Sequence, residues 1–327
     1  MAMPASLQAL MLSSSRMDPP GWIIAVMPAS LAACTQSAKG KNASDPITLP
    51  VQPLASLSIS LYLPGDTGPC TCHATGQQTL LVSGSGDFTA GSFTPKQTLT
   101  LRAFLSGVLV EGDHRDHAVV VLGDSISDGV GSTVDANRRW PDLLAARLAE
   151  KRHPWGVVNM GISGNQLLAD GAGQSALARF DRDVLAVPGA KIVIVFIGVN
   201  DLGLSYGKMP FRVAGEPGPK VTQESMLAGY RQLIFRAHAA GLKVIGATIT
   251  PYEGASYYAP EGEAIRQEIN HWIRKSRELD GVIDFDALMR DPQKPTQIKP
   301  AFTADHLHGN DAGYAAMAAA VDLALLD

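Results

Sequence analysis

Apolar residues in the last two thirds of the chain gather in short, nearly unbroken runs, and glycines or polar residues follow each run. Three strong runs occupy residues 118–122, 157–160 and 192–197, and two further runs lie at 243–250 and 281–285. Such runs of β-branched and apolar residues are typical of strands that a parallel sheet buries on both faces. We therefore predict five parallel strands in this part of the chain.

Segments with apolar residues at helical spacing separate these runs. Thr222 is suited to cap a helix that stops at Gly241, and the Ala-rich segment at the carboxyl terminus is expected to begin its helix at Asn310 or Asp311. Another apolar stripe consists of Ile265, Ile269, Trp272 and Ile273. Strands that alternate with helices, joined by right-handed crossovers, predict a parallel sheet covered on both faces.

The first hundred residues follow a different pattern. The chain has 27 Lys and Arg residues and 31 Asp and Glu residues, and only eight of these charged residues lie in this part. Amphipathic helices need charged outer faces, so we expect little helix here. Apolar and polar residues instead alternate at 57–63, 79–83 and 98–104, between turns rich in Gly and Pro. These segments predict a small β-rich region.

The chain is therefore expected to have three parts: an irregular leader at 1–42, a β-rich accessory region at 43–115 and an α/β domain at 116–327. The leader contains Ser-Leu-Ala-Ala-Cys, which resembles a lipoprotein signal-peptidase site with Cys34 as the lipidated residue. This interpretation predicts a secreted or periplasmic protein, and the alternative is a disordered or cloning-derived extension. No run of 18 apolar residues occurs, so no spanning helix is expected.

Composition and charge narrow the function classes. A chain of 327 residues with 46% hydrophobic residues is normal for a globular protein. A net charge of −4 and a pI near 6.1 provide no basic field for phosphate backbones, so nucleic acid is not an expected partner. Cys70 and Cys72 are too close for an easy bridge, and Cys34 has no obvious mate, so we expect no disulfide framework.

Candidate chemistry lies where the apolar runs end. Ser125 follows the first run through Gly-Asp, at the sheet edge where ligands bind in open α/β folds. A serine hydroxyl is a weak nucleophile until a base accepts its proton, and the base needs a partner that fixes its tautomer. Asp305 and His308, in a loop before the terminal helix, have the spacing to supply both. Each feature alone is more often structural, and the combination favours catalysis.

Two further residues fit acyl transfer, which needs donors aimed at the oxyanion of a tetrahedral intermediate. Gly161 ends the second run, and Asn200 follows the third in Gly-Val-Asn-Asp. A backbone N–H and a side-chain amide at strand ends are suitable donors. The alternative is that Gly161 only turns the chain and that Asn200 only caps the next segment.

These blocks, Gly-Asp-Ser, Gly, Gly-x-Asn-Asp and Asp-x-x-His, resemble in this order the GDSL or SGNH hydrolase superfamily, over residues 116–327. The resemblance implies a three-layer α/β/α flavodoxin-like fold with a parallel five-stranded sheet. It implies Ser125 as nucleophile, His308 as general base and Asp305 as the partner of His308, and the family spacing selects His308 over His306. It implies an oxyanion hole formed by the N–H of Ser125, the N–H of Gly161 and the side chain of Asn200.

The β-rich region resembles the front module of secreted, carbohydrate-active GDSL esterases from about residue 43 to 110. Because residues 1–42 replace the first part of that module, we expect a partial sandwich or jelly-roll-like arrangement.

Rival motifs fit less well. The nucleophile elbow Gly-x-Ser-x-Gly of another hydrolase fold requires glycine where Ser127 stands, and a dinucleotide fingerprint requires glycine at Val134. His306 and His308 lack a second cluster that would complete a zinc site, so no metal is expected. The predicted chemistry requires no cofactor.

We therefore predict a serine carboxylester hydrolase that acts on short acyl esters, and the family resemblance favours acetylated carbohydrates. Alternatives are a broad aryl esterase, a lysophospholipase or thioesterase, and, from other classes, an inactive carbohydrate-binding protein or a structural interaction protein. The intact triad argues against an inactive protein. A small-molecule or polysaccharide ester is the expected partner, and the oligomeric state is not predicted. Candidates for substrate contact are Asp124, Asn165, Phe211, Tyr252, Tyr257 and Tyr258.

Overall fold

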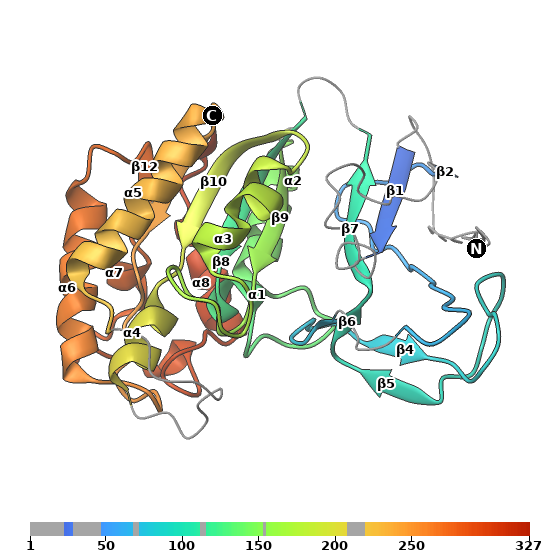
Figure 1. The fold of residues 1–327 in the computed structure, drawn as a ribbon, viewed down its shortest axis with the longest axis horizontal. Coiled ribbons are helices and arrows are strands. Elements are labelled where there is room, and N and C mark those ends of the chain that lie inside the picture. The colour runs from blue at the N-terminus through green and yellow to red at the C-terminus, as the bar shows by residue number, and fades with distance from the viewer. Residues whose placement is uncertain (1–22, 29–46, 68–71, 112–115, 153–154, 208–219) are drawn as a thin grey trace. The chain divides into compact units, whose positions relative to one another are not determined.

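The protein divides into two compact units, residues 1–115 and 116–327, in the computed structural model (Figure 1). The boundary falls where the charge-poor part of the sequence ends. The structure describes residues 23–28, 47–67, 72–111, 116–152, 155–207 and 220–327.

A five-stranded parallel sheet forms the centre of the second unit, in the order β12-β11-β10-β8-β9. Its strands are β8 (His117–Gly123), β9 (Trp155–Gly161), β10 (Ala190–Phe196), β11 (Lys243–Ala247) and β12 (Gly281–Ile283). Gly123 pairs with Gly161 on one side and with Phe196 on the other, so three strands end at the same edge. The predicted sheet is confirmed, and β11 and β12 are shorter than their apolar runs.

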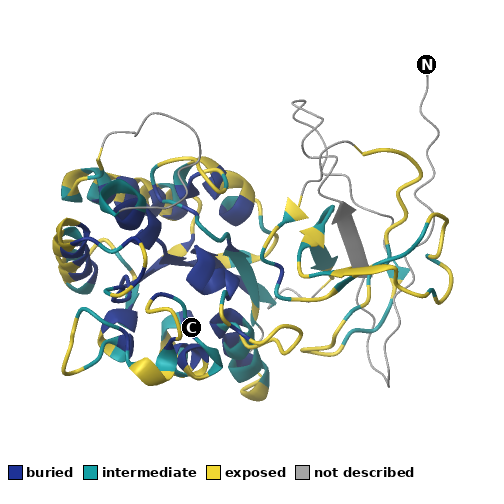
Figure 2. Cartoon of the chain, turned by 90° about the horizontal axis from the view of Figure 1, so that it is seen from below, coloured by how far each residue is buried: buried dark blue, intermediate teal, exposed yellow. Residues whose placement is uncertain are grey.

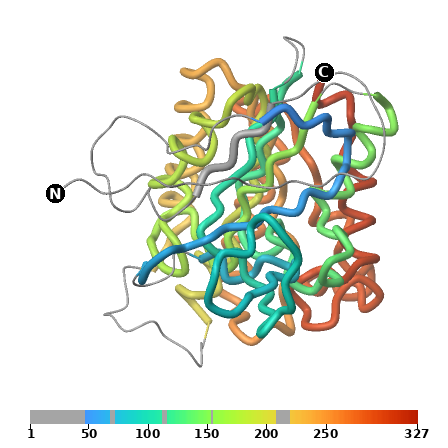
Figure 3. Tube along the Cα trace, turned by 90° about the vertical axis from the view of Figure 1, so that its right-hand side faces the viewer, coloured from blue at the N-terminus to red at the C-terminus, as the bar shows by residue number. Residues whose placement is uncertain are grey.

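Helices cover both faces of this sheet, which gives the expected three layers. The terminal helix α8 (Asp311–Ala320) packs against α2 (Trp140–Glu150) and α7 (Phe285–Met289). The second layer consists of α3 (Ala176–Phe180), α5 (Gln223–Ala239) and α6 (Pro260–Lys275), and α5 contacts both of the others. Figure 3 shows red α8 and gold α5 on opposite sides of the strands. Two short helices, α1 (Ser125–Asp128) and α4 (Val199–Tyr206), follow β8 and β10.

Helix ends and core follow the sequence pattern closely. The Thr222 side chain accepts a hydrogen bond from the N–H of Ser225 at 3.2 Å and so caps α5, and Gly241 follows this helix at φ +77°. Asn310 caps α8. The strands are the most buried part of the unit, with residues 119–122 of β8 inaccessible to solvent (Figure 2). Burial on both faces explains why these strands read as continuous apolar runs.

The first unit contains only small sheets within the described residues. Its strands are β1 (Ile23–Pro28), β2 (Ile47–Thr48), β3 (Cys72–His73), β4 (Leu80–Val82), β5 (Gln97–Leu99), β6 (Arg102–Ala103) and β7 (Leu105–Val110). They form the antiparallel sheet β2-β1-β7 and the pairs β3-β6 and β4-β5. Outside β1, no apolar side chain described in this unit is buried, so the packing of a complete sandwich is not present in this part.

Several expectations for the first unit are wrong. Residues 57–63 alternate in polarity but form no strand and are largely exposed, because alternation alone supplies no pairing partner. The leader is not wholly irregular, since β1 lies within it and pairs with β7.

Cys72 is disulfide-bonded, and both other cysteines, Cys34 and Cys70, lie outside the described residues. A disulfide is typical of oxidising compartments, and the cellular location stays a prediction.

Within the described ranges, no helix is long and apolar enough to cross a bilayer.

Candidate active site

Gly123, Asp124 and Ser125 form the tight turn that takes the chain from β8 into α1. A Cβ at Gly123 would overlap the Ser127 side chain, so only glycine fits there. The Asp124 carboxylate accepts a hydrogen bond from the N–H of Ile126 at 3.0 Å and caps the single turn of α1. Ser125 therefore begins this helix at the carboxyl edge of the sheet.

Ser125, His308 and Asp305 form one continuous chain of hydrogen bonds. The Nε2 atom of His308 lies 2.9 Å from Ser125 Oγ, and its Nδ1 atom lies 2.6 Å from Asp305 Oδ2. These distances suit proton transfer from the hydroxyl to the imidazole. The structure thus joins residues that lie 183 positions apart in the sequence.

The Asp305 carboxylate is fixed by its own loop. Its Oδ1 atom accepts hydrogen bonds from the backbone N–H groups of Leu307 and His308, at 3.0 and 2.8 Å. Burial opposes ionisation of Asp305, but the hydrogen bonds from His308 outweigh it and hold the pKa well below the usual range. Asp305 is therefore anionic at neutral pH and fixes the Nδ1–H tautomer of His308.

His306, the rival base, points elsewhere. It is exposed and adopts φ +64°, in the left-handed region, and its ring lies over the backbone of Gly254. No described contact joins it to Ser125, whereas His308 makes that contact directly.

The loop that carries His308 is braced by the segment after α1. Asp311 accepts hydrogen bonds from both the N–H and the hydroxyl of Thr133, at 2.8 and 2.7 Å. Gly131 lies so close to the loop that a Cβ there would approach the Gly309 carbonyl oxygen to 2.7 Å. These contacts hold the imidazole in register with Ser125.

Asn200 lies at the start of α4 with its amide fixed from two directions. Its Nδ2 donates to the backbone carbonyl of Asn165 at 3.0 Å, and its Oδ1 accepts from the hydroxyl of Tyr257 at 3.1 Å. An amide nitrogen carries two hydrogens, so one N–H of Asn200 remains after these contacts. Helix α4 ends six residues later at Tyr206, whose hydroxyl donates to the Val221 carbonyl.

Gly161 does not have the predicted arrangement of an oxyanion donor. Its N–H donates to Asn159 Oδ1 at 2.9 Å, and the Asn159 amide in turn donates to the Ser127 carbonyl at 2.6 Å. A Cβ at Gly161 would overlap the backbone of Asp128. The glycine is therefore needed for close packing of β9 against α1, and its N–H already has an acceptor.

The turn after β9 offers a different donor. Ser163 bonds to Asp128 Oδ2 through both its N–H and its hydroxyl, at 3.0 and 2.7 Å, and Asn165 accepts the Asn200 amide. Gly164, at φ +78°, lies between these two anchors, and its N–H has no acceptor among the described residues. The sequence carries the signal, since Gly-Ile-Ser-Gly contains two glycines, but pattern alone does not choose between them.

Arg179 is a functional residue that sequence reasoning missed. Its buried guanidinium donates to the Gly123 carbonyl at 3.0 Å, to the Met160 carbonyl at 2.7 Å and to Asn165 Oδ1 at 3.0 Å, and it pairs with Asp183. One cation thus ties the ends of β8 and β9 to the turn that carries Gly164. Nothing in the apolar periodicity marks it, because an arginine on a short helix is normally a surface residue.

Three predicted substrate contacts have buried side chains, and their contact with a substrate stays a prediction. Asp124 caps α1, and burial raises its pKa to about 7. Asn165 is inaccessible to solvent and bonds to Arg179 and to the Gln174 carbonyl. Tyr252 is also inaccessible, and its hydroxyl makes no described hydrogen bond. The Asp124 carboxyl and the Asn165 amide therefore have structural partners within the fold.

The other three candidates have different outcomes. Tyr257 is 6% exposed and bonds to Asn200. Tyr258 is half-buried, with its ring packed edge-on against Tyr252, and its substrate contact stays a prediction. Phe211 lies outside the described residues.

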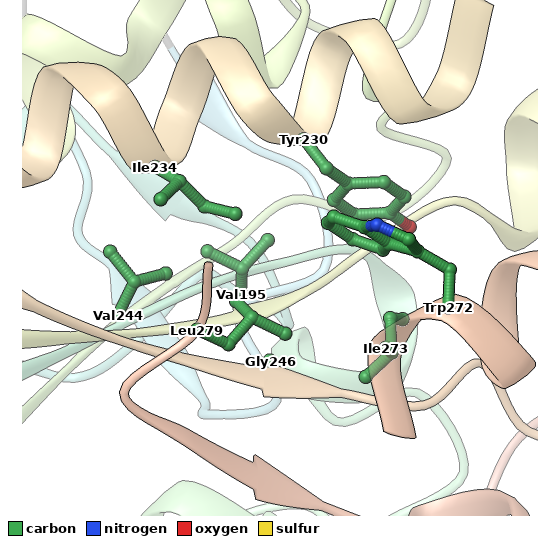
Figure 4. Close-up of a pocket in the computed structure, with 8 residues that line it drawn as sticks. All are labelled: Val195, Tyr230, Ile234, Val244, Gly246, Trp272, Ile273 and Leu279. Carbon is green, nitrogen blue, oxygen red and sulfur yellow. The ribbon is translucent and has the colours of Figure 1, made fainter. Parts of the chain in front are cut away.

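The apolar cavity in Figure 4 is not part of this site. It lies between the sheet and helices α5 and α6, and its lining includes Val195, Tyr230 and Trp272. Val195 comes from β10 before its carboxyl end, and no lining residue belongs to the Ser125 cluster. In the described ranges, no three His, Cys, Asp or Glu residues are grouped to hold a metal ion.

Comparison with known proteins agrees with this geometry. The model of the GDSL-like lipase/acylhydrolase family matches residues 121–316, which is more than half of the chain. Esterase TesA of Pseudomonas aeruginosa is 31% identical over 163 residues, which cover 49% of this chain and 69% of the relative.

Solved structures with lower sequence identity are also similar to this chain. A crystal structure of TesA is 23% identical with a TM-score of 0.48, covering 64% of this chain and 98% of its own. A GDSL-like lipase from Bacteroides thetaiotaomicron is 19% identical with a TM-score of 0.49, covering 67% of this chain and 92% of its own. The acetyl xylan esterase AlAXEase is 21% identical with a TM-score of 0.47, covering 62% of this chain and 96% of its own. On the family match and the relative of known activity, the chain belongs to the GDSL-like lipase/acylhydrolase family and is an esterase of the GDSL type.

Proposed function

We propose that Ser125 carries out carboxylester hydrolysis through a covalent acyl-enzyme, with His308 as general base and Asp305 as its orienting partner. The observation that carries the proposal is the continuous hydrogen-bonded chain from Ser125 Oγ through the imidazole to the Asp305 carboxylate. Asp305 donates no proton in this scheme. It holds the ring and stabilises the imidazolium that forms.

In the first half-reaction, Ser125 Oγ attacks the ester carbonyl carbon while His308 Nε2 takes the hydroxyl proton. The carbonyl double bond opens to an oxyanion, which then re-forms the double bond and expels the alkoxide. His308 returns its proton to that leaving oxygen, so the alcohol departs and the acyl group stays on Ser125. Water then attacks the acyl-enzyme with the same base, and the acid leaves as Ser125 regains its proton.

The oxyanion requires donors that are not already used. Ser125 N–H begins α1 and has no acceptor among the described residues, and the Asn200 amide keeps one hydrogen after binding Asn165. For the third donor we propose Gly164 in place of Gly161, because the N–H of Gly161 is held by Asn159 and that of Gly164 is free within the described residues.

A triad test separates this mechanism from a binding role. Wild type should hydrolyse p-nitrophenyl acetate, and Ser125→Ala or His308→Ala should each lower kcat by on the order of 10³ or more, because triad members act as a unit. The double variant should be no slower than either single variant. Wild-type turnover in Ser125→Ala would reject the mechanism and favour an inactive binding protein on the same scaffold.

The proposed substrate is an ester with a short acyl group. Each methylene of a long chain gains about 0.8 kcal/mol only if an apolar wall receives it. Polar side chains such as Asp128, Ser163 and Asn200 instead follow the ends of β8, β9 and β10, and the apolar cavity of Figure 4 includes no residue of the Ser125 cluster. Acetylated carbohydrate is the leading natural substrate on the family resemblance.

A series of p-nitrophenyl esters from acetate to decanoate, with acetylated xylan alongside, tests the substrate separately from the mechanism. We expect kcat/KM to fall as the acyl chain lengthens and acetate to be released from xylan. A preference for decanoate would favour a lysophospholipase or thioesterase, and activity restricted to aryl acetates would favour an aryl esterase.

A further inference from the structure

Tyr257 occupies a position that neither the family match nor the triad explains. It follows β11 in the loop before α6, yet it is 6% exposed and lies against α4, an element more than 50 residues earlier in the chain. Its hydroxyl donates a hydrogen bond to Asn200 Oδ1 at 3.1 Å. A buried tyrosine hydroxyl normally finds one partner, and here the partner is the predicted oxyanion amide.

Helix α4 is shaped to admit this ring. Gly203 stands three residues after Asn200 and therefore on the same helix face, and a Cβ there would overlap the ring of Tyr257. Glycine inside a helix is less stable than alanine by roughly 0.5–1 kcal/mol. Gly207, which ends α4, likewise leaves room for the Tyr257 backbone. The two glycines thus lower the helix propensity of α4 and leave room for the phenol beside Asn200.

The phenol determines which way the Asn200 amide faces. With Oδ1 held by Tyr257 and one Nδ2 hydrogen held by the Asn165 carbonyl, the remaining N–H has a fixed direction. If the amide rotated by half a turn, Nδ2 would face the Tyr257 hydroxyl, which would then have to accept a hydrogen bond instead of donating one. Oδ1 would face the carbonyl oxygen of Asn165. The second contact is repulsive, so the two partners together disfavour the orientation that would present oxygen to an oxyanion.

We propose that Tyr257 is a positioning residue for the oxyanion hole, acting through Asn200 and without touching the substrate. This inference rests on the proposed esterase mechanism. Burial raises the pKa of Tyr257 well above its ordinary value, so the phenol stays protonated and remains a donor at every pH at which the enzyme is assayed.

The chain offers a matched control in Tyr252. Its ring lies 6.0 Å from that of Tyr257 between centroids, it is fully buried, and its hydroxyl makes no hydrogen bond among the described residues. Tyr252→Phe and Tyr257→Phe therefore each remove one phenolic oxygen from the same aromatic cluster, and only Tyr257→Phe removes a contact to Asn200.

The test is a double-mutant cycle on the full chain with p-nitrophenyl acetate, with rates divided by the active-site concentration from acyl-burst titration so that unfolded molecules do not count. Tyr257→Phe should lower kcat roughly tenfold, as for loss of one neutral hydrogen bond, and leave KM within about twofold. Tyr252→Phe should keep the wild-type kcat. In an Asn200→Ala background, Tyr257→Phe should have no further effect on kcat, because the residue through which it acts is gone.

Three results would overturn the proposal: a Tyr257→Phe variant with the kcat of Tyr252→Phe, a change confined to KM, or losses that multiply in the double variant. A change confined to KM would indicate substrate contact, and multiplying losses would indicate an independent role. None of these results touches the triad, which fails only if Ser125→Ala stays active.

Discussion

Arg179 provides the sharpest test of how the fold holds the site. Replacing it with methionine keeps the length of the apolar stem and removes the guanidinium that bonds to Gly123, Met160 and Asn165. Two of its partners keep another contact in the variant, since the Gly123 carbonyl also accepts from the N–H of Ile162 and Asp183 also pairs with Arg182. The Met160 carbonyl is only part-buried and belongs to the paired strand β9, so the buried Asn165 side-chain oxygen is the acceptor that loses its donor.

The magnitude follows from that one oxygen. An unsatisfied buried acceptor is destabilising by about 1–3 kcal/mol, so Arg179→Met should lower the free energy of unfolding by roughly 1–3 kcal/mol. For a unit of this size that corresponds to a fall in Tm of roughly 2–12 °C. Arg182→Met is the matched control, because this arginine pairs with the same Asp183 but its side chain is 56% exposed. Exposed ion pairs contribute at most about 1 kcal/mol.

Urea denaturation followed by tryptophan fluorescence measures the difference, since Trp140 is fully buried in the core of this unit. Activity under conditions where Arg179→Met is folded gives a second measurement. We expect reduced kcat there as well, because the guanidinium fixes both the strand end before Ser125 and the turn that carries Gly164. Equal losses of stability in the two arginine variants would refute the argument, because they would show that pairing with Asp183 is all that matters.

Two further predictions concern carboxylates. Burial raises the pKa of Asp124 from 3.8 to about 7 in the folded protein, so its ionisation opposes folding, and its unfavourable contribution grows between about pH 4 and pH 7. Asp124→Asn should therefore gain up to about 4 kcal/mol of stability relative to wild type over that range, measured as unfolding free energy against pH; a pH-independent difference would contradict this. Asp305→Asn should lower kcat by roughly 10³–10⁴-fold, because an amide cannot hold the productive tautomer of His308 as an anion does. Stopped assays of p-nitrophenyl acetate check this, and a loss below about tenfold would remove Asp305 from the mechanism.

The sequence predicted those features that depend on local pattern. Strands buried on both faces must be apolar at every position, so β8 and β10 are visible as runs such as residues 118–122. Thr222 marks the start of α5 because a cap bonds to a residue three positions away. Asp305 and His308 were recognisable for the same reason, since their contact spans three residues of one loop.

Contacts between elements that are far apart in the sequence could not be predicted from such a local pattern. Alternation at residues 57–63 suggested a strand, but a strand needs a partner, and none is paired with it in the described residues. Tyr252 and Tyr257 looked alike as loop aromatics, and only the fold shows that both are buried and that one of them bonds to Asn200.

The sequence by itself determined the sheet, the position of Ser125 at its edge and the Asp-x-x-His loop, because burial and short-range hydrogen bonds impose residue types at fixed spacings. Tertiary structure alone decided which N–H groups are free. Gly161 and Gly164 lie three residues apart in one motif, and they differ because the Ser127 carbonyl of α1 holds the Asn159 amide so that its oxygen accepts the N–H of Gly161. Whether an N–H group is already hydrogen-bonded depends on the acceptor that folding places against it, and the sequence pattern does not specify that acceptor.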